Sequence, residues 1–160
     1  MLVDRDGAAR IAGLGSAFIS TQNHGTWSEM DAELLSYGSA PELVRPNTPE
    51  SRTQTTKKSD IYAFGLLAWE VSYFYQLSSD RSLNRADPQL FAGHVPFRGT
   101  HQLGAIYSLA TGDRPPRPDH PELSDDIWNL IRRCWNDNPS NRPPIETVLA
   151  TLQEQVSKPL

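Results

Sequence analysis

The sequence predicts a mainly α-helical protein with a short N-terminal β-hairpin and a buried central helix. Residues 61–69 contain no charged side chain and place apolar groups on every side of a helical wheel, a pattern typical of a helix surrounded by protein. Two later segments, 127–134 and 145–152, carry apolar residues at helical spacing. Residues 2–12 show two short apolar runs around an Asp-Gly turn, which favours a hairpin.

The composition is that of an ordinary folded domain. The chain has 160 residues, of which 38% are hydrophobic and 21% charged, and its net charge is −4; these values argue against disorder. No basic stripe is visible, so we expect no nucleic-acid partner. The lone Cys134 excludes an internal disulfide, and the first 15 residues lack the apolar run of a signal peptide. The apolar helix is too short to span a membrane, and a cytoplasmic location, or the nucleus, is expected.

Each element has its own local evidence. The hairpin pairs Leu2-Val3 with residues 9–12. The central helix is predicted over 59–75, with Ser59 and Asp60 as starting residues because their side-chain oxygens can accept from first-turn N–H groups. A third helix is predicted over 101–110. The last two helices begin after Ser124, a capping residue, and after Pro143-Pro144, residues that a first turn tolerates. Their predicted core residues are Ile127, Leu130, Ile131, Cys134, Ile145, Val148, Leu149 and Leu152.

Six ordered motifs carry a resemblance. Residues 58–65 read K-S-D-I-Y-A-F-G and are followed by Trp69-Glu70. The other five are the run 2–15, Ala40-Pro41-Glu42, G-x-x-P-F-x-G at 93–99, G-x-R-P-x-R-P at 112–118, and C-W-x-x-x-P-x-x-R-P at 134–143. Together they resemble the large lobe of a protein kinase domain, nearest to the tyrosine-kinase-like Ser/Thr group, in an incomplete and degenerate form.

The resemblance implies a partial protein kinase domain over residues 1–156 with a tail at 157–160. Its parts would be the hairpin and activation segment (1–42), an insertion loop (44–57), the central helix (59–75), a second insertion loop (76–92) and the C-terminal helices (100–156).

The resemblance also implies which chemistry is missing. Kinases use ATP and Mg²⁺, and the metal is held by an Asp in the D-F-G motif. Gly13 stands at that position, with Leu14 and Gly15 after it, so no metal ligand is expected there. The sequence contains no H-R-D catalytic loop, no glycine-rich loop and no V-A-I-K lysine. We therefore expect no catalytic residues, cofactor or metal in this chain, which by itself should not transfer phosphate. The four histidines show no metal-ligand spacing.

Four residues are expected to have structural roles. Glu42 and Arg142 would form the buried ion pair that joins the activation segment of kinases to the last helices. Asp60, which in kinases accepts hydrogen bonds from the catalytic loop, would instead cap its own helix, and Trp135 belongs to the closing motif. Candidate phosphoacceptors in the activation segment are Ser20, Thr21, Thr26 and Ser28.

Several interpretations remain open. The chain is either a non-catalytic, pseudokinase-like signalling module that binds a protein partner, or a truncated piece of an active ATP-dependent kinase. A third hypothesis is a helical interaction domain with chance motifs. The run 114–118 is either a polyproline ligand or a connector. Gly13-x-Gly15 fails as a dinucleotide fingerprint, because Phe18 occupies the third glycine position.

The missing kinase segments, or a partner protein, would normally cover part of the central helix. In this chain we expect part of the face built from five residues to lack that cover: Ile61, Tyr62, Phe64, Leu66 and Trp69.

Overall fold

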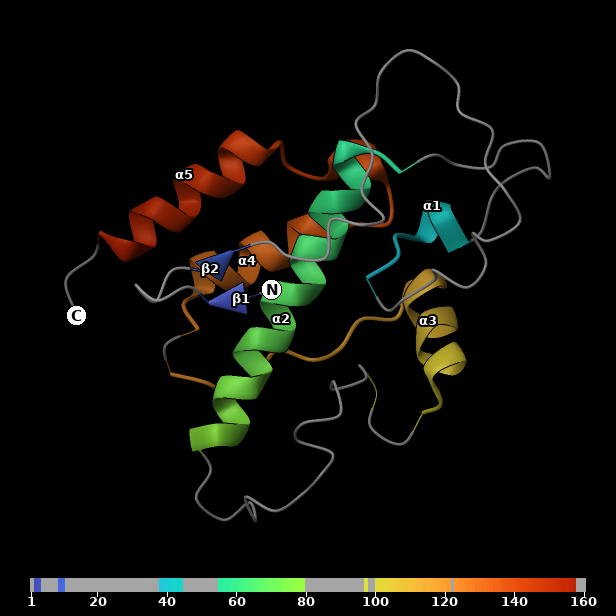
Figure 1. The fold of residues 1–160 in the computed structure, drawn as a ribbon, viewed down its shortest axis with the longest axis horizontal. Coiled ribbons are helices and arrows are strands. Elements are labelled where there is room, and N and C mark those ends of the chain that lie inside the picture. The colour runs from blue at the N-terminus through green and yellow to red at the C-terminus, as the bar shows by residue number, and fades with distance from the viewer. Residues whose placement is uncertain are drawn as a thin grey trace. The chain divides into compact units, whose positions relative to one another are not determined.

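The computed structural model describes residues 2–3, 9–10, 38–44, 55–79, 97, 100–121 and 123–157. Its elements, in chain order, are β1 (Leu2–Val3), β2 (Ala9–Arg10), α1 (Pro41–Val44), α2 (Lys57–Ser79), α3 (Gln102–Ala110), α4 (Asp125–Cys134), the 3-10 helix η4 (Pro139–Asn141) and α5 (Ile145–Val156) (Figure 1). The chain divides into two units, 1–33 and 34–160. Every described helix belongs to the second.

The predicted fold class needs correction at the N-terminus. The described residues of the second unit are helical and contain no strand, so the β-hairpin is not an element of that fold. What the first unit has is a ladder of two residues per strand, which pairs Leu2 with Arg10 and Val3 with Ala9. The turn residues 4–8 lie outside the described part. A two-stranded ladder this short has almost no apolar face to bury, so it cannot act as a structural layer.

Helix α2 begins earlier than predicted, because a different residue caps it. The hydroxyl of Thr56 accepts from the N–H groups of Lys58 (3.2 Å) and Ser59 (3.1 Å), and the Ser59 hydroxyl accepts in return from the Thr56 N–H (2.8 Å). This reciprocal arrangement is a capping box. The prediction that Asp60 caps the helix is therefore wrong, and Asp60 is exposed. The helix also continues to Ser79, beyond the predicted end at residue 75.

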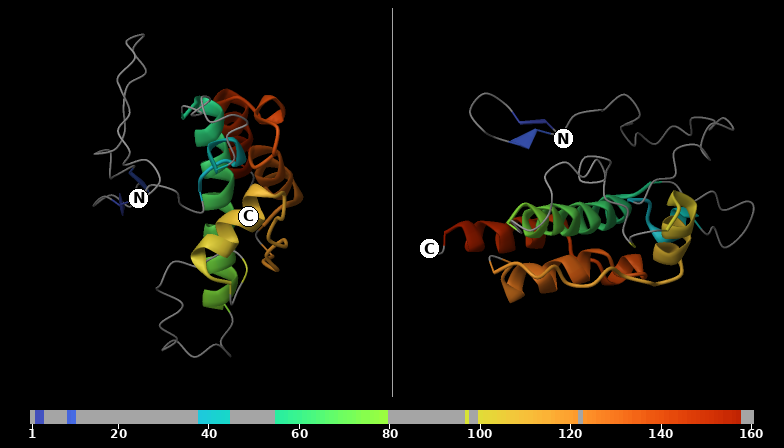
Figure 2. Two further views of the ribbon diagram at one scale, coloured as in Figure 1. Left: turned by 90° about the vertical axis from the view of Figure 1, so that its right-hand side faces the viewer. Right: turned by 90° about the horizontal axis from the view of Figure 1, so that it is seen from below.

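One side of α2 forms the core of the helical unit. Tyr62, Leu66 and Trp69 are buried against residues of α3 and α4. A second cluster joins α2 to α4 and α5 through Ile61, Leu130, Cys134 and Val148. The main cluster also contains Ala40, Leu109, Leu123, Ile131 and Trp135. Figure 2 shows α4 running beside α2, as expected from these contacts.

The opposite side of α2 is not buried. Leu67, Val71 and Phe74 remain 40%, 41% and 43% exposed, so the buried part of this helix is the side that carries Tyr62, Leu66 and Trp69. Of the face expected to be partly uncovered, Ile61, Tyr62, Leu66 and Trp69 are all 5% exposed or less, and Phe64 is partly buried; the exposed apolar residues lie elsewhere on the helix. When a helix is apolar on every side, its sequence does not indicate which side will pack against the neighbouring helices.

The close contact between α2 and α4 depends on a glycine. A Cβ atom built on Gly65 would lie 2.9 Å from the Cβ of Cys134 and 3.1 Å from the backbone nitrogen of Trp135. Real Cβ atoms essentially never show the first distance, and the second is tighter than nine in ten real Cβ contacts. The absence of a side chain at this position therefore sets the distance between the two helices.

The last two helices start as the sequence indicates, but the predicted core of α5 was wrong at two positions, since Ile145 and Leu149 are 55% and 53% exposed. The Ser124 hydroxyl accepts from the Ile127 N–H (3.3 Å) at the first turn of α4, and Pro144 precedes α5 without a side-chain cap. Ser124 also donates to Gln155 (3.0 Å), which links the start of α4 to the end of α5. Across the part of the chain described here, none of the helices combines the length and the hydropathy needed to cross a membrane.

Candidate functional site

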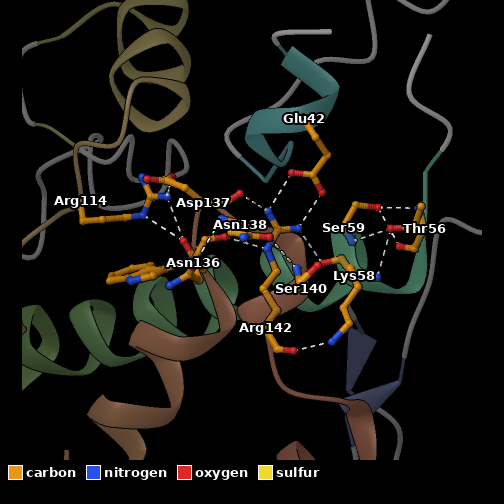
Figure 3. Close-up of polar contacts among 11 residues, drawn as sticks. Glu42, Thr56, Lys58, Ser59, Arg114, Asn136, Asp137, Asn138, Ser140 and Arg142 are labelled. Atoms are coloured by element: carbon orange, nitrogen blue, oxygen red, sulfur yellow. Dashed lines mark hydrogen bonds and ion pairs between the residues drawn. The ribbon is translucent and has the colours of Figure 1, made fainter. Parts of the chain in front are cut away.

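The site is built around Arg142, whose side chain is almost completely buried. Its guanidinium forms a two-pronged ion pair with Glu42 of α1, with Nη1 2.6 Å from Oε1 and Nη2 2.7 Å from Oε2 (Figure 3). This fork geometry matches the guanidinium plane to the carboxylate plane. The ion pair expected from the resemblance is thus present, and it joins residues 100 positions apart in the chain.

The remaining Arg142 donors bind backbone carbonyls. Nε donates to Asn136 O (2.8 Å), Nη1 also donates to Lys58 O (2.9 Å), and Nη2 to Asp137 O (3.2 Å). All five N–H groups of the guanidinium therefore have acceptors. Lys58 returns the contact, since its Nζ donates to the Arg142 carbonyl. A cation can be buried at low cost only when all of its hydrogen-bond donors have acceptors. These hydrogen bonds hold α1 and the start of α2 against the 136–142 turn.

A second arginine, Arg114, supports the same turn. Its guanidinium donates to the carbonyls of Leu109 (2.8 Å) and Trp135 (2.9 Å) and forms an ion pair with Asp137. Asp137 therefore accepts from both arginines: its carboxylate binds Arg114 and its backbone carbonyl binds Arg142. Arg114 was not among the residues predicted for the site, although the Arg in the 112–118 motif was a signal that could have indicated it.

Tyr62 of α2 lies against both guanidinium groups. The guanidinium carbon of Arg142 is 5.0 Å from the centre of the Tyr62 ring, and that of Arg114 is 5.5 Å away; both distances are typical of cation–π contacts. The Tyr62 hydroxyl is buried and has no hydrogen-bond partner among the described residues. Burial raises the pKa of this phenol to about 12, because the interior disfavours the phenolate.

This environment predicts that Tyr62→Phe does not destabilise the protein near neutral pH. An unpaired buried hydroxyl costs about 1–3 kcal/mol, so the variant should equal or exceed the wild type in urea unfolding at pH 8. The folded pKa lies above the unfolded value, so the folded state keeps its proton where the unfolded state has lost it. The wild type should thus lose up to about 1.4 kcal/mol per pH unit between about pH 10 and 12, relative to Tyr62→Phe. A variant less stable than the wild type at pH 8 would mean that the hydroxyl has a partner.

The run 114–118 serves as a connector in the structure. Pro115 and Pro118 are buried, the Pro116 carbonyl accepts from Trp69 Nε1 (2.8 Å), and Arg117 donates to the Leu123 carbonyl (2.7 Å). A polyproline ligand must present its prolines and carbonyls to a partner. These groups are used internally, so the ligand interpretation is wrong.

The contacts of this network are those of a structural anchor. Cys134 is buried, and desolvation raises the pKa of its thiol to about 11, which opposes formation of a nucleophilic thiolate. Among the described residues, no group of three or more His, Cys, Asp or Glu side chains could hold a metal ion. What the site does is hold three distant segments in a fixed arrangement.

The other predicted residues have separate locations. Asp60 is exposed on α2 and takes no part in the network. Trp135 lies in the core, where its ring contacts Trp128 edge-on at 5.7 Å. The position of the absent metal ligand and the candidate phosphoacceptors lie outside the described residues; they are Gly13, Ser20, Thr21, Thr26 and Ser28. The site residues that sequence analysis missed are Thr56, Lys58, Tyr62, Arg114 and Asp137.

Comparison with known proteins gives the context for this geometry. Residues 1–152 match the family described as protein tyrosine and serine/threonine kinase. A probable serine/threonine-protein kinase of Dictyostelium discoideum is 28% identical over 96% of the chain, and the serine/threonine/tyrosine-protein kinase HT1 of Arabidopsis thaliana is 26% identical over 96%. The human proto-oncogene tyrosine-protein kinase ROS is 32% identical over 69%.

The chain is much shorter than these relatives. It spans 14% of the Dictyostelium protein, 32% of HT1 and 4% of ROS. The match to the family nevertheless covers nearly all of the 160 residues, and it includes both partners of the Glu42–Arg142 ion pair. The chain therefore belongs to the protein tyrosine and serine/threonine kinase family.

Proposed function

We propose that this chain is a non-catalytic, pseudokinase-like module that acts through contact with another protein. The observation that carries the proposal is Gly13, which stands where the family's D-F-G motif has its Asp. That carboxylate holds the Mg²⁺ that bridges the β- and γ-phosphates of the nucleotide. A glycine has no side-chain oxygen, so the metal loses a ligand that no neighbouring residue type replaces: the next two residues are Leu14 and Gly15.

Two structural features support the same proposal. The Arg142 network is complete, with every guanidinium N–H satisfied, so the helical scaffold keeps its anchor without depending on the metal position. The apolar residues on the outer side of α2 are partly exposed, and exposed apolar surface is a common feature of protein contact sites. The scaffold is thus suited to binding a protein.

The proposal predicts that Mg·ATP does not stabilise the 160-residue chain. A ligand at a hundredfold excess over its dissociation constant adds about 2.7 kcal/mol, which thermal unfolding detects readily. We expect the same melting temperature with ATP and Mg²⁺, with ATP and EDTA, and without nucleotide. A melting temperature that rises only when Mg²⁺ and ATP are both present would overturn the non-catalytic proposal.

The alternative is that these residues belong to a longer, active Ser/Thr kinase. The length of the relatives supports this alternative, since the chain covers only 14% of the Dictyostelium kinase and 32% of HT1. The test is ATP-dependent phosphate transfer by the full-length protein with Gly13 in place. Transfer at a rate that Gly13→Asp does not raise would favour the alternative. No transfer from the full-length protein would favour the non-catalytic proposal.

A further inference from the structure

Helix α3 begins at a capping residue that can gain a proton. The backbone of His101 is extended, and its ring nitrogen Nδ1 accepts a long hydrogen bond, 3.4 Å, from the N–H group of Leu103. The His101 carbonyl accepts the first backbone hydrogen bond of the helix, from the N–H group of Ala105 at 3.0 Å. Residues with a non-titrating hydroxyl or amide, or a carboxylate, usually hold this position. A histidine cap makes the start of α3 sensitive to the charge of one imidazole.

The contact between His101 and Leu103 requires a neutral ring. An imidazole nitrogen can accept only when it carries no proton, so the proton of His101 must be on Nε2. Protonation turns both ring nitrogens into donors, and the Leu103 N–H group then loses its acceptor. The imidazolium also places a positive charge beside the positive end of the helix dipole. Both effects oppose the first turn of α3.

The first turn of α3 has little else to hold it. It contains no acidic residue that could favour the N-terminal end of the helix. Gly104 lies inside the helix, where glycine is a poor helix former, and Leu103 is 70% exposed. Among the described side chains of α3, the buried ones begin at Ala105. Opening the first turn therefore leaves the packed part of the helix in place.

The described charged groups around α3 do not pair with His101. Residues 100–110 contain no Asp, Glu, Lys or Arg. Helix α1 packs against α3, and its one charged side chain, Glu42, forms an ion pair with Arg142. The main core cluster contacts α3 through Leu109, at the other end of the helix, where Arg114 donates to the Leu109 carbonyl. No ion pair joins His101 to a carboxylate in the described part of the chain.

We propose that the first turn of α3 is a pH-sensitive switch, held closed by neutral His101 and released when His101 gains a proton. Histidine is the side chain that ordinarily changes its charge between about pH 5 and pH 8. The turn should thus be closed at the upper end of this range and open more often at the lower end. The inference goes beyond the proposed function and does not depend on it.

Amide hydrogen exchange in the 160-residue chain, followed by NMR at about pH 7.5 and about pH 5, tests this inference. The readout is the protection factor of the Ala105 N–H group, which is the intrinsic exchange rate divided by the observed rate. This ratio removes the pH dependence of exchange itself. We expect the wild-type value to be about tenfold lower at the acidic pH, the combined effect of losing an N-cap and opposing the helix dipole.

Three variants assign the response to one ring. His101→Asn keeps a capping oxygen and cannot gain a proton, so its Ala105 protection factor should match the wild type at the higher pH and stay there at the lower one. His101→Ala has no cap and should show low protection at both. His120→Asn removes a histidine outside α3 and should leave the pH response of Ala105 unchanged.

Helix α4 supplies an internal control. Its cap is the hydroxyl of Ser124, which does not titrate in this range. The Trp128 N–H group donates to the Ser124 carbonyl (2.9 Å), the position that Ala105 has in α3. The protection factor of Trp128 should be the same at both pH values.

Two results would overturn the inference. A wild-type Ala105 protection factor that is equal at the two pH values would show that protonation does not release the turn. A pH response of Ala105 that persists in His101→Asn would show that another group causes it.

Discussion

Replacing Arg142 by Ala is expected to lower the free energy of unfolding by about 3–5 kcal/mol. The exchange removes the guanidinium that pairs with the Glu42 carboxylate, whose side chain is 21% exposed, and it leaves three backbone carbonyls without their donor. Glu42→Ala should cost a similar amount, because the buried guanidinium would keep its charge and lose its counter-charge. Urea unfolding of the two variants measures both free energies. If an alanine variant fails to fold, Glu42→Gln tests the same ion pair, because it removes the charge and keeps the shape of the side chain.

The double variant is the decisive part of this measurement. With both charges gone, no unpaired ion remains, so Glu42→Ala/Arg142→Ala should cost much less than the sum of the single variants. The matched control is the Arg117–Asp125 pair, which is also joined at 2.6 Å but has side chains 40% and 83% exposed. Its coupling should be below about 1 kcal/mol. Single effects that simply add would show that Glu42 and Arg142 do not interact in solution.

Gly65→Ala should lower the free energy of unfolding by about 1–3 kcal/mol, the usual cost of overfilling a packed interface. In an open helix position the same exchange is favourable by about 1 kcal/mol, because alanine is the better helix former. At Gly65 the new Cβ would meet the Cβ of Cys134 at 2.9 Å and the Trp135 backbone nitrogen at 3.1 Å. Backbone cannot rotate away, so α2 and α4 must separate. Gly65→Val should be worse than Gly65→Ala.

Gly104 of α3 provides the matched control for this prediction. A Cβ there would meet only the side-chain methyl of Thr100, at 2.7 Å, and Thr100 is exposed and able to rotate. Gly104→Ala should therefore leave stability unchanged or raise it by up to about 1 kcal/mol. If both exchanges changed stability equally, the close α2–α4 contact would not be the cause of the Gly65 effect.

Local features of the fold were largely determined by the sequence. The apolar spacing of residues 127–134 predicted α4, and Ser124 predicted its cap, because a helix start depends on groups within one turn of each other. Motif order, carried by the family resemblance, indicated that Glu42 would meet Arg142 across the chain. The start of α2 was misjudged for a local reason as well. Thr56 and Ser59 satisfy each other's N–H groups, and Asp60 was given the role that Thr56 has.

The long-range arrangement was decided by the tertiary structure. Spacing along α2 could not show that Leu66 and Trp69 would be buried while Leu67 and Val71 stay exposed, because all four are equally apolar. Nothing in the sequence around Tyr62 indicated that Arg114 and Arg142 would both approach its ring. Periodicity and capping report interactions within a few residues of each other. Burial and ion pairing depend on which distant segments come into contact, and these contacts form only when the helices pack together.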